Sequence, residues 1–149
     1  MVFSPVLDPA NWRRDMKATL VTAAVLAAGL VSAEPGKPIA LLDQVPYRDE
    51  GMGSRKIVDE KHVLMMQAAL KPGQKVPEHK ANSNVHIVGL QGAVIVNLAG
   101  TDAAVKAGDL LPIAFGTPMH IRNDGQENAT FLIVKTPNPS EMQKAPAAP

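Results

Sequence analysis

The side chains best suited to chemistry in this sequence are its four histidines, His62, His79, His86 and His120. A neutral imidazole binds transition-metal ions and also transfers protons near neutral pH. One imidazole cannot hold a divalent ion tightly, so a metal site needs further donors close by. Cysteine is absent, which excludes thiolate ligands, thiolate nucleophiles and disulfides. A metal site built on imidazoles must therefore bring several of these histidines together.

Proton transfer without a metal would need two groups with matched pKa values in contact. His79 and its neighbour Glu78 do not form such a pair, because successive residues of a strand point to opposite faces. Pairs of His79 with His120 or with Tyr47 remain open. The sequence has no serine in a nucleophile elbow and no glycine-rich phosphate loop before a helix.

Met65, Met66 and Met119 offer thioether sulfurs, which suit a soft copper site in an exported protein. Packing is the preferred role of these side chains, because flexible methionines fill gaps in a core. Beyond residue 33 the aromatic residues are Tyr47, Phe115 and Phe131, so a core with few rings needs such fillers.

Residues 16–33, MKATLVTAAVLAAGLVSA, have the composition of a secretory signal peptide. Residues 20–31 form an uncharged apolar core too short to span a bilayer comfortably, small residues end it, and positive residues precede it, namely Arg13, Arg14 and Lys17. A buried core helix is the alternative, but the run lacks a polar face and the composition changes abruptly at residues 34–36. We predict cleavage after Ala33 and a periplasmic or secreted mature protein.

The start and the route of export remain open. Met16 is a second plausible start, which would place residues 1–15 outside the translated chain. The Arg13-Arg14 pair suggests twin-arginine export of a folded protein, although the residues after it depart from the usual pattern.

Beyond Ala33 the acidic and basic residues balance. Of the 15 Lys and Arg residues and the 14 Asp and Glu residues, three basic and two acidic ones precede Glu34. Nucleic acids and anionic membranes bind local surpluses of positive charge, which this segment lacks. We expect no nucleic-acid partner, and no membrane contact after the signal is cleaved.

The same segment alternates short β-type runs with turn residues, and it has no long helical period. The runs are residues 55–59, 62–70, 76–80, 85–90, 93–98, 103–106, 110–113, 119–122 and 130–135. So many short strands predict an all-β, antiparallel, closed or double-sheet fold, because an open sheet would leave its edges exposed.

We predict four parts along the chain. They are an N-terminal extension with the signal peptide (1–33), a lead segment with a short strand at residues 39–42 (34–54), a β-barrel (55–137) and a Pro/Ala-rich tail expected to be disordered (138–149).

The glycines and prolines of this pattern resemble those of the cupin superfamily over residues 62–136. The matching residues are Pro72, Gly73, Pro77, His79, Gly92, Gly108, Asp109, Gly116, Pro118 and Asn123. The resemblance implies a small antiparallel jelly-roll barrel and, as is common for small cupins, a homodimer. It also implies two motifs whose three histidines and one glutamate point into the barrel and bind one divalent metal ion (Fe, Mn, Zn, Ni or Cu).

Most of those ligand positions are replaced in this chain. Aligned with the family motifs, His79 keeps the first ligand, whereas the other three positions hold Ala81, Val85 and Met119. Methyl groups and a thioether cannot supply the imidazole and carboxylate donors of the family site. The resemblance therefore implies a barrel whose metal site is largely lost, and no cofactor is the preferred expectation.

The alternation of side chains along a strand predicts which way the remaining histidines face. Met119 alternates with His120, which places Met119 inward and His120 outward. The same rule places His79 inward, together with Pro77 and Ala81.

A metal site of different composition is the alternative. His86 and His120 each follow a replaced ligand position by one residue, and a β-bulge near Gly89 could rotate His86 inward. A site of His79, His86 and His120 would make the protein a mononuclear metal-dependent enzyme of the oxygenase or isomerase type.

We predict a pocket in the barrel for a small, partly apolar ligand, lined by His79, Ala81, Val85, Met119 and Ile121. The leading hypothesis is an exported single-domain cupin that binds such a ligand or has an accessory, non-catalytic role. A purely structural partner domain is a third possibility, which a cavity too small for any ligand would favour.

Overall fold

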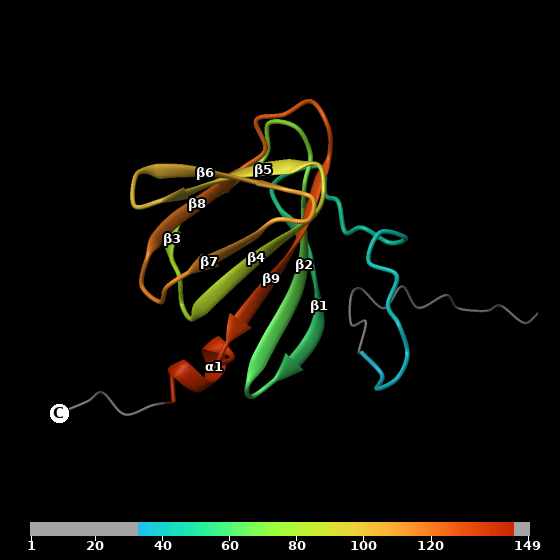
Figure 1. Cartoon of the computed structure of the whole chain (residues 1–149), viewed down its shortest axis with the longest axis vertical. Coiled ribbons are helices and arrows are strands. Elements are labelled where there is room, and N and C mark those ends of the chain that lie inside the picture. The colour runs from blue at the N-terminus through green and yellow to red at the C-terminus, as the bar shows by residue number, and fades with distance from the viewer. Residues whose placement is uncertain (1–32, 145–149) are drawn as a thin grey trace, which may run out of the picture.

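Nine antiparallel strands make up most of the computed structural model, which describes residues 33–144 (Figure 1). They are β1 (Gly53–Glu60), β2 (Val63–Leu70), β3 (Lys75–Lys80), β4 (Asn84–Gln91), β5 (Ala93–Leu98), β6 (Thr101–Lys106), β7 (Leu110–Ile113), β8 (Pro118–Arg122) and β9 (Ala129–Thr136). Each of the nine β-type runs in the sequence corresponds to one of these strands. Among the described residues no helix has the length and apolar character needed to cross a membrane.

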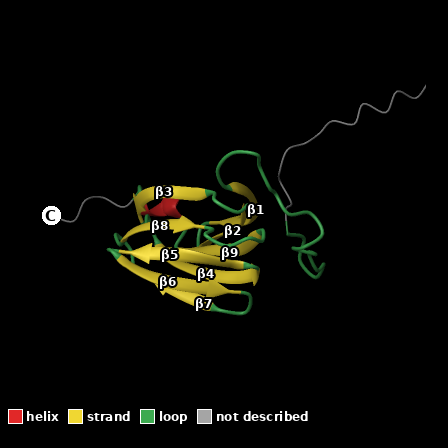
Figure 2. Cartoon of the chain, turned by 90° about the horizontal axis from the view of Figure 1, so that it is seen from above, coloured by secondary structure: helices red, strands yellow, loops and turns green. Residues whose placement is uncertain are grey.

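The strands form two sheets that face each other (Figure 2). One sheet has five strands in the order β1-β2-β9-β4-β7, and the other has four in the order β3-β8-β5-β6. Strands distant in the sequence, such as β2 and β9, are hydrogen-bonded neighbours, which is the connectivity of a jelly roll. The predicted all-β jelly-roll fold is confirmed.

The hydrophobic core lies between the two sheets. On β4, Val85 and Ile87 are buried while His86 and Val88 are only partly so, and β9 continues the alternation with buried Phe131. This period of two is what a strand with one face on a core requires. The inner face of each strand is therefore fixed by its sequence.

Asn123 closes one end of the barrel and is fully buried. Its Nδ2 donates to the carbonyl oxygens of Leu70 at 3.0 Å and Glu127 at 2.8 Å, and its Oδ1 accepts from the backbone N–H of Gly125 at 3.0 Å. A buried amide with all these bonds made is structural. It ties the loop before β9 to the end of β2.

Residues 39–42 form no strand, so the prediction of a strand there is wrong, and the first strand begins only at Gly53. Residues 41–43 lie in a turn in which the N–H of Asp43 donates to the carbonyl of Ala40 at 3.4 Å. The segment is held instead by side chains of the barrel. Gln67 Nε2 donates to the Leu41 carbonyl at 2.5 Å, and Gln74 Nε2 donates to the Arg48 carbonyl at 3.1 Å.

The tail is partly ordered, which corrects the expectation of disorder for its first residues. A short helix, α1 (Pro139–Met142), begins after Asn138, whose Oδ1 accepts from the Ser140 N–H at 3.1 Å. Asn138 Nδ2 donates to Asp59 Oδ1 at 2.7 Å and so ties the helix to β1. The predicted signal peptide lies outside the described residues apart from Ala33, as do residues 145–149.

Candidate functional site

A small cavity of about 90 Å³ lies between the two sheets. All five residues predicted to line the barrel interior are in its wall: His79, Ala81, Val85, Met119 and Ile121. The other wall residues are Met52, Met66, Val76, Ile87, Ile133 and Lys135. Most of the wall is aliphatic or thioether.

A β-bulge in β3 decides which residues of that strand face the cavity. Val76 is paired with Ile121 and His79 with Met119, so two residues of β3, Pro77 and Glu78, lie opposite one residue of β8, His120. The extra residue lets Val76 and His79 both point inward. The predicted inward orientation of Pro77 is wrong, because Pro77 is exposed and lines a groove on the outer side with Glu78.

His79 lies at the mouth of the cavity, where its ring is exposed. Its Nδ1 is 2.9 Å from the carbonyl oxygen of Pro77. A carbonyl oxygen only accepts, so Nδ1 carries the proton and donates it. The neutral ring therefore keeps Nε2 as a free acceptor or ligand atom.

Lys135 is the charged residue of the cavity wall. It lies on β9 opposite Val85, two residues beyond Ile133, and its Nζ donates to Asn82 Oδ1 at 3.1 Å. Burial lowers the pKa of its ammonium group, because an apolar wall solvates charge poorly. The alternation Phe131, Ile133, Lys135 could have identified this inward lysine from the sequence.

The three methionines considered for a soft site do not lie together. Met66 and Met119 line the cavity, but Met65 points to the other face of its strand, opposite Val134 of β9. A different methionine, Met52, takes part in the wall. Met52 precedes the first strand, where no periodicity marks its direction.

His120 faces away from the cavity, as strand alternation predicts. Its Nε2 lies 3.4 Å from Arg122 Nη1, which can only donate, so the ring accepts there. Arg122 also bonds Asp102 Oδ2 and Asp124 Oδ2, each at 2.6 Å. Hydrogen bonds from Arg122 hold the pKa of Asp102 well below its usual range.

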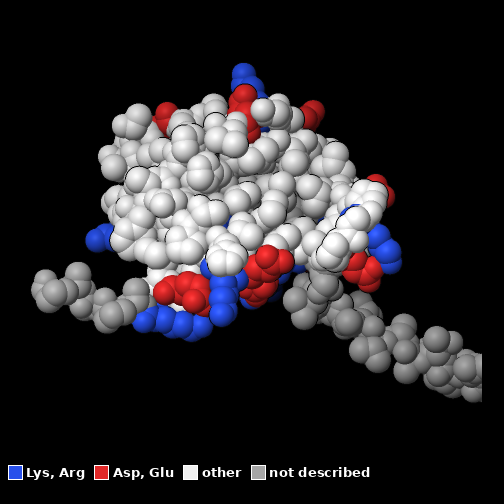
Figure 3. All heavy atoms as spheres, turned by 60° about the horizontal axis from the view of Figure 1, so that its bottom comes forward, with Lys and Arg blue, Asp and Glu red and all other residues white. Residues whose placement is uncertain are grey.

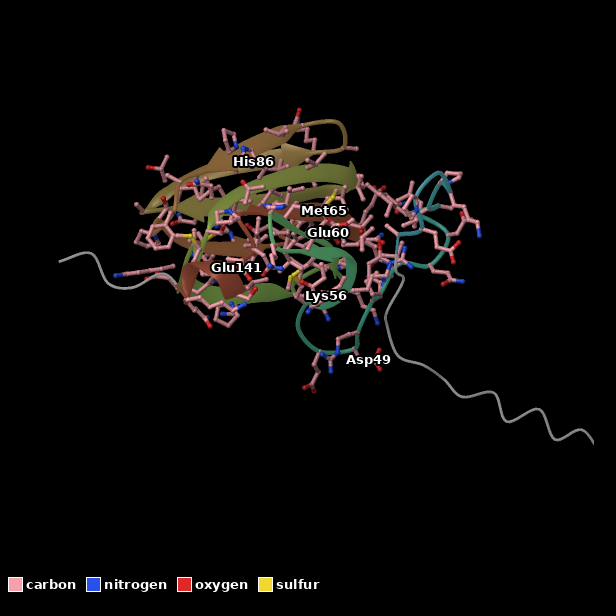
Figure 4. All side chains as sticks on the ribbon, turned by 90° about the horizontal axis from the view of Figure 1, so that it is seen from below. Asp49, Lys56, Glu60, Met65, His86 and Glu141 are labelled. Atoms are coloured by element: carbon pink, nitrogen blue, oxygen red, sulfur yellow. The ribbon has the colours of Figure 1, made fainter. Side chains whose placement is uncertain are left out.

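His86 also faces outward, because its neighbours Val85 and Ile87 both line the cavity. It lies opposite Val134 of β9 on one side and Pro112 of β7 on the other, with no register shift beside it. His86 and Met65 are labelled in Figure 4. A register shift does occur in β4, as considered, but it lies between Gly89 and Gln91 and leaves His86 in place.

The structure thus does not bring His79, His86 and His120 together. Within residues 33–144 no group of three or more His, Cys, Asp or Glu side chains could hold a metal ion. Neither candidate proton-transfer partner of His79 is in the cavity wall: His120 faces outward, and Tyr47 is not one of the wall residues.

Comparison with known proteins identifies the family. No protein-family model matches the chain. The chain is 30% identical over 95 residues to the uncharacterized protein MJ0764 of Methanocaldococcus jannaschii. The matched region covers 63% of this chain and 81% of that protein. The crystal structure of mj0764, an RmlC-like cupin with a double-stranded β-helix fold, matches with a TM-score of 0.58 over 65% of this chain and 91% of that chain. The chain belongs to the cupin superfamily.

Other cupins of known structure are also similar. An RmlC-like cupin from Desulfovibrio desulfuricans, at 22% identity, has a TM-score of 0.61 over 68% of this chain and 96% of that chain. A predicted oxalate decarboxylase from Thermotoga maritima, at 26% identity, has a TM-score of 0.52 over 57% of this chain and 79% of that chain.

The cavity occupies the place where the cupin motifs put their metal ligands. All four aligned positions line it, and they hold His79, Ala81, Val85 and Met119. These four positions therefore supply one imidazole and one thioether, and the whole wall contains no carboxylate. Such a donor set does not fit a divalent ion that needs several imidazole and carboxylate ligands.

Proposed function

We propose that this cupin is an exported, non-catalytic binding domain whose cavity holds a small, partly apolar ligand. The supporting observation is that aliphatic and thioether side chains make up most of the wall, with His79 and Lys135 as its polar groups. Such a wall binds by burying apolar surface, and a few polar groups orient the ligand.

The size of the cavity limits the ligand. Its volume is about 90 Å³. Pockets for drug-sized ligands are larger, at roughly 300–1,000 Å³. The ligand class that fits is therefore a molecule of only a few non-hydrogen atoms.

The wall of the cavity gives little support to catalysis of the kind named for the Thermotoga maritima protein. The wall has a single imidazole without a second acid or base beside it, apart from the lysine. A metal-dependent enzyme with His79, His86 and His120 as ligands receives no support, since two of these rings point to outer faces.

Ala81→Leu tests the binding proposal. Ala81 is 3% exposed and lies in the wall, so leucine would fill the space that a ligand needs. We expect xenon or short-chain alcohols to perturb the methyl resonances of Val85 and Ile87 in the wild type but not in the variant. Ala104→Leu, on the exposed side of β6, is the matched control. Absence of any response in the wild type would favour the purely structural role.

The identity of the first residue of the exported protein tests the proposal that the chain is exported and cleaved. We propose that cells with a general secretory pathway release a chain beginning at Glu34, because residues 20–33 have the apolar core and small residues that a signal peptidase recognises. Mass spectrometry of the exported protein gives the first residue. A cytoplasmic, full-length product would contradict both the location and the cleavage site.

We also propose a homodimer formed through the outer face of the five-stranded sheet. Over β2, β9, β4 and β7 this outer face is largely apolar and includes Met65, His86, Val88, Leu110, Pro112, Leu132 and Val134, whereas at β1 it carries Arg55, which is buried against Gln67 of β2. Figure 3 shows a broad uncharged face with the charged side chains at its rim. Two such faces can meet about a two-fold axis without like-charge repulsion.

Leu132→Glu tests this dimer, because the two-fold axis would place two buried carboxylates near each other. We expect light scattering to give the mass of a dimer for the wild type and of a monomer for the variant. Ala104→Glu, on the other sheet, should leave the dimer unchanged. A wild type that is monomeric at micromolar concentrations would contradict the proposal.

A further inference from the structure

Three methionines and one histidine converge on the cavity from different segments of the chain. Met52 precedes β1, Met66 lies on β2, and Met119 lies on β8 directly opposite His79 of β3. Apart from the Lys135 amine, every side-chain donor atom in the wall is a thioether sulfur or an imidazole nitrogen. This donor set differs in kind from the one that the cupin motifs imply.

We propose that this cavity binds one Cu(I) ion through the thioether sulfurs of Met52, Met66 and Met119 and through Nε2 of His79. Thioethers are soft, neutral ligands that select Cu(I) over the harder divalent ions. The inference does not rest on the small-ligand proposal, since it uses the donor atoms of the wall and not its apolar surface.

The imidazole is already in the form that a metal ion requires. Nδ1 of His79 donates to the Pro77 carbonyl at 2.9 Å, which leaves the lone pair of Nε2 free. Metal-bound histidines almost always donate their second ring N–H to a carbonyl or a carboxylate in this way. The bond fixes the tautomer before the ion arrives.

The cavity suits an ion in size and in access. A volume of about 90 Å³ accepts a single ion without displacing the sheets. Methionine has three rotatable side-chain bonds, so the sulfurs can turn toward the ion at small cost. Met119 is 3% exposed whereas His79 is exposed, so the ion would enter past the imidazole and meet the buried sulfur next.

Lys135 favours a monovalent over a divalent ion. Its ammonium is the formal charge in the wall, and it is drawn toward Asn82 by a hydrogen bond of 3.1 Å. Coulomb repulsion is proportional to the charge of the ion, so Cu(I) meets half the repulsion that Cu(II) or Zn(II) meets at the same distance.

Methionine-to-leucine variants of the whole chain test the site, with Ag(I) or ascorbate-reduced Cu(I) as the probe and a coloured Cu(I) chelator as the competitor. We expect the wild type to bind one ion. Met66→Leu, Met119→Leu and His79→Ala should each weaken binding by about tenfold or more, since even outer-shell changes cost ~10–100-fold. Met65→Leu is the matched control, because Met65 lies next to Met66 but faces outward.

Circular dichroism first checks that each variant is folded. X-ray absorption of the copper-loaded wild type then reports sulfur and nitrogen neighbours without any variant. Three results would each overturn the copper site. They are coordination of copper by oxygen alone, an affinity of the folded chain no higher than that of the chain unfolded in urea, and equal losses of affinity in Met65→Leu and Met66→Leu. None of these results would affect the test of small-ligand binding with Ala81→Leu.

Discussion

His79 of β3 and Met119 of β8 lie directly opposite each other and both face the cavity. Residues opposed in this way across antiparallel strands have Cβ atoms roughly 4.5–5.5 Å apart. The pair joins the exposed mouth of the cavity to its buried interior, and it holds two of the four positions that carry metal ligands in the cupin motifs.

The tautomer of His79 can be observed directly. In its neutral form we expect the proton on Nδ1, because the Pro77 carbonyl accepts a bond from that atom. A long-range ¹H–¹⁵N correlation spectrum distinguishes the two ring nitrogens. His62, an exposed residue at the turn between β1 and β2, serves as the reference. A protonated Nε2 in the neutral ring of His79 would contradict the assignment and weaken the copper proposal.

Asn123→Ala should destabilise the barrel strongly. The change leaves the Leu70 and Glu127 carbonyls without their partner, and each unsatisfied buried group costs roughly 1–3 kcal/mol. We expect the free energy of unfolding to fall by ~2–5 kcal/mol in urea titrations. Asn128→Ala, at an exposed position of the same loop, should change it by less than ~0.5 kcal/mol.

Arg122→Gln should make stability less dependent on acid pH. Because Arg122 lowers the pKa of Asp102 in the folded state, this carboxylate stabilises the fold above the unfolded value of about 3.9, and the contribution is lost as the pH falls through the folded pKa. The variant should therefore be less stable than the wild type near pH 6, with a difference that shrinks at lower pH.

Thermal unfolding from pH 2 to 7 measures this difference, and the carboxyl resonance of Asp102 should titrate at a higher pH in the variant. An unchanged titration of Asp102 would show that Arg122 does not control it. Lys56→Gln, which removes a separate exposed ion pair with Asp59, is the comparison.

Lys135→Leu should raise the melting temperature near neutral pH. Burial lowers the pKa of this ammonium, so the folded state bears a cost that is present while the group is charged in both states. The cost declines as the pH rises through the folded pKa toward the unfolded value of about 10.4. The gain from leucine should therefore be largest near pH 7 and smaller near pH 10.

Differential scanning calorimetry at the two pH values tests this dependence on pH. Lys106→Leu, at an exposed position of β6, should give no comparable gain. A lower melting temperature for Lys135→Leu at pH 7 would show that the bond to Asn82 outweighs the cost of burial.

Strand positions and cavity-lining residues could be predicted from the sequence because both follow from a period of two. Turn residues separate the nine strands, and apolar alternation marks the inner faces of β4, β8 and β9. The strand predicted at residues 39–42 does not form, because this short apolar run has no partner strand to pair with. The direction of Pro77 could not be predicted, since a β-bulge changes the alternation and leaves no unique mark in the sequence.

The bulge in β3 makes the wall of the cavity tolerant of a change in strand length. Val76 and His79 face the same way because two residues lie between them while only one lies between their pairing partners, Ile121 and Met119. Deleting one of the two bulged residues would leave a single residue between Val76 and the histidine, and simple alternation would still point both side chains into the cavity. A lineage could thus lose the bulge through the loss of one codon and keep the imidazole of its barrel.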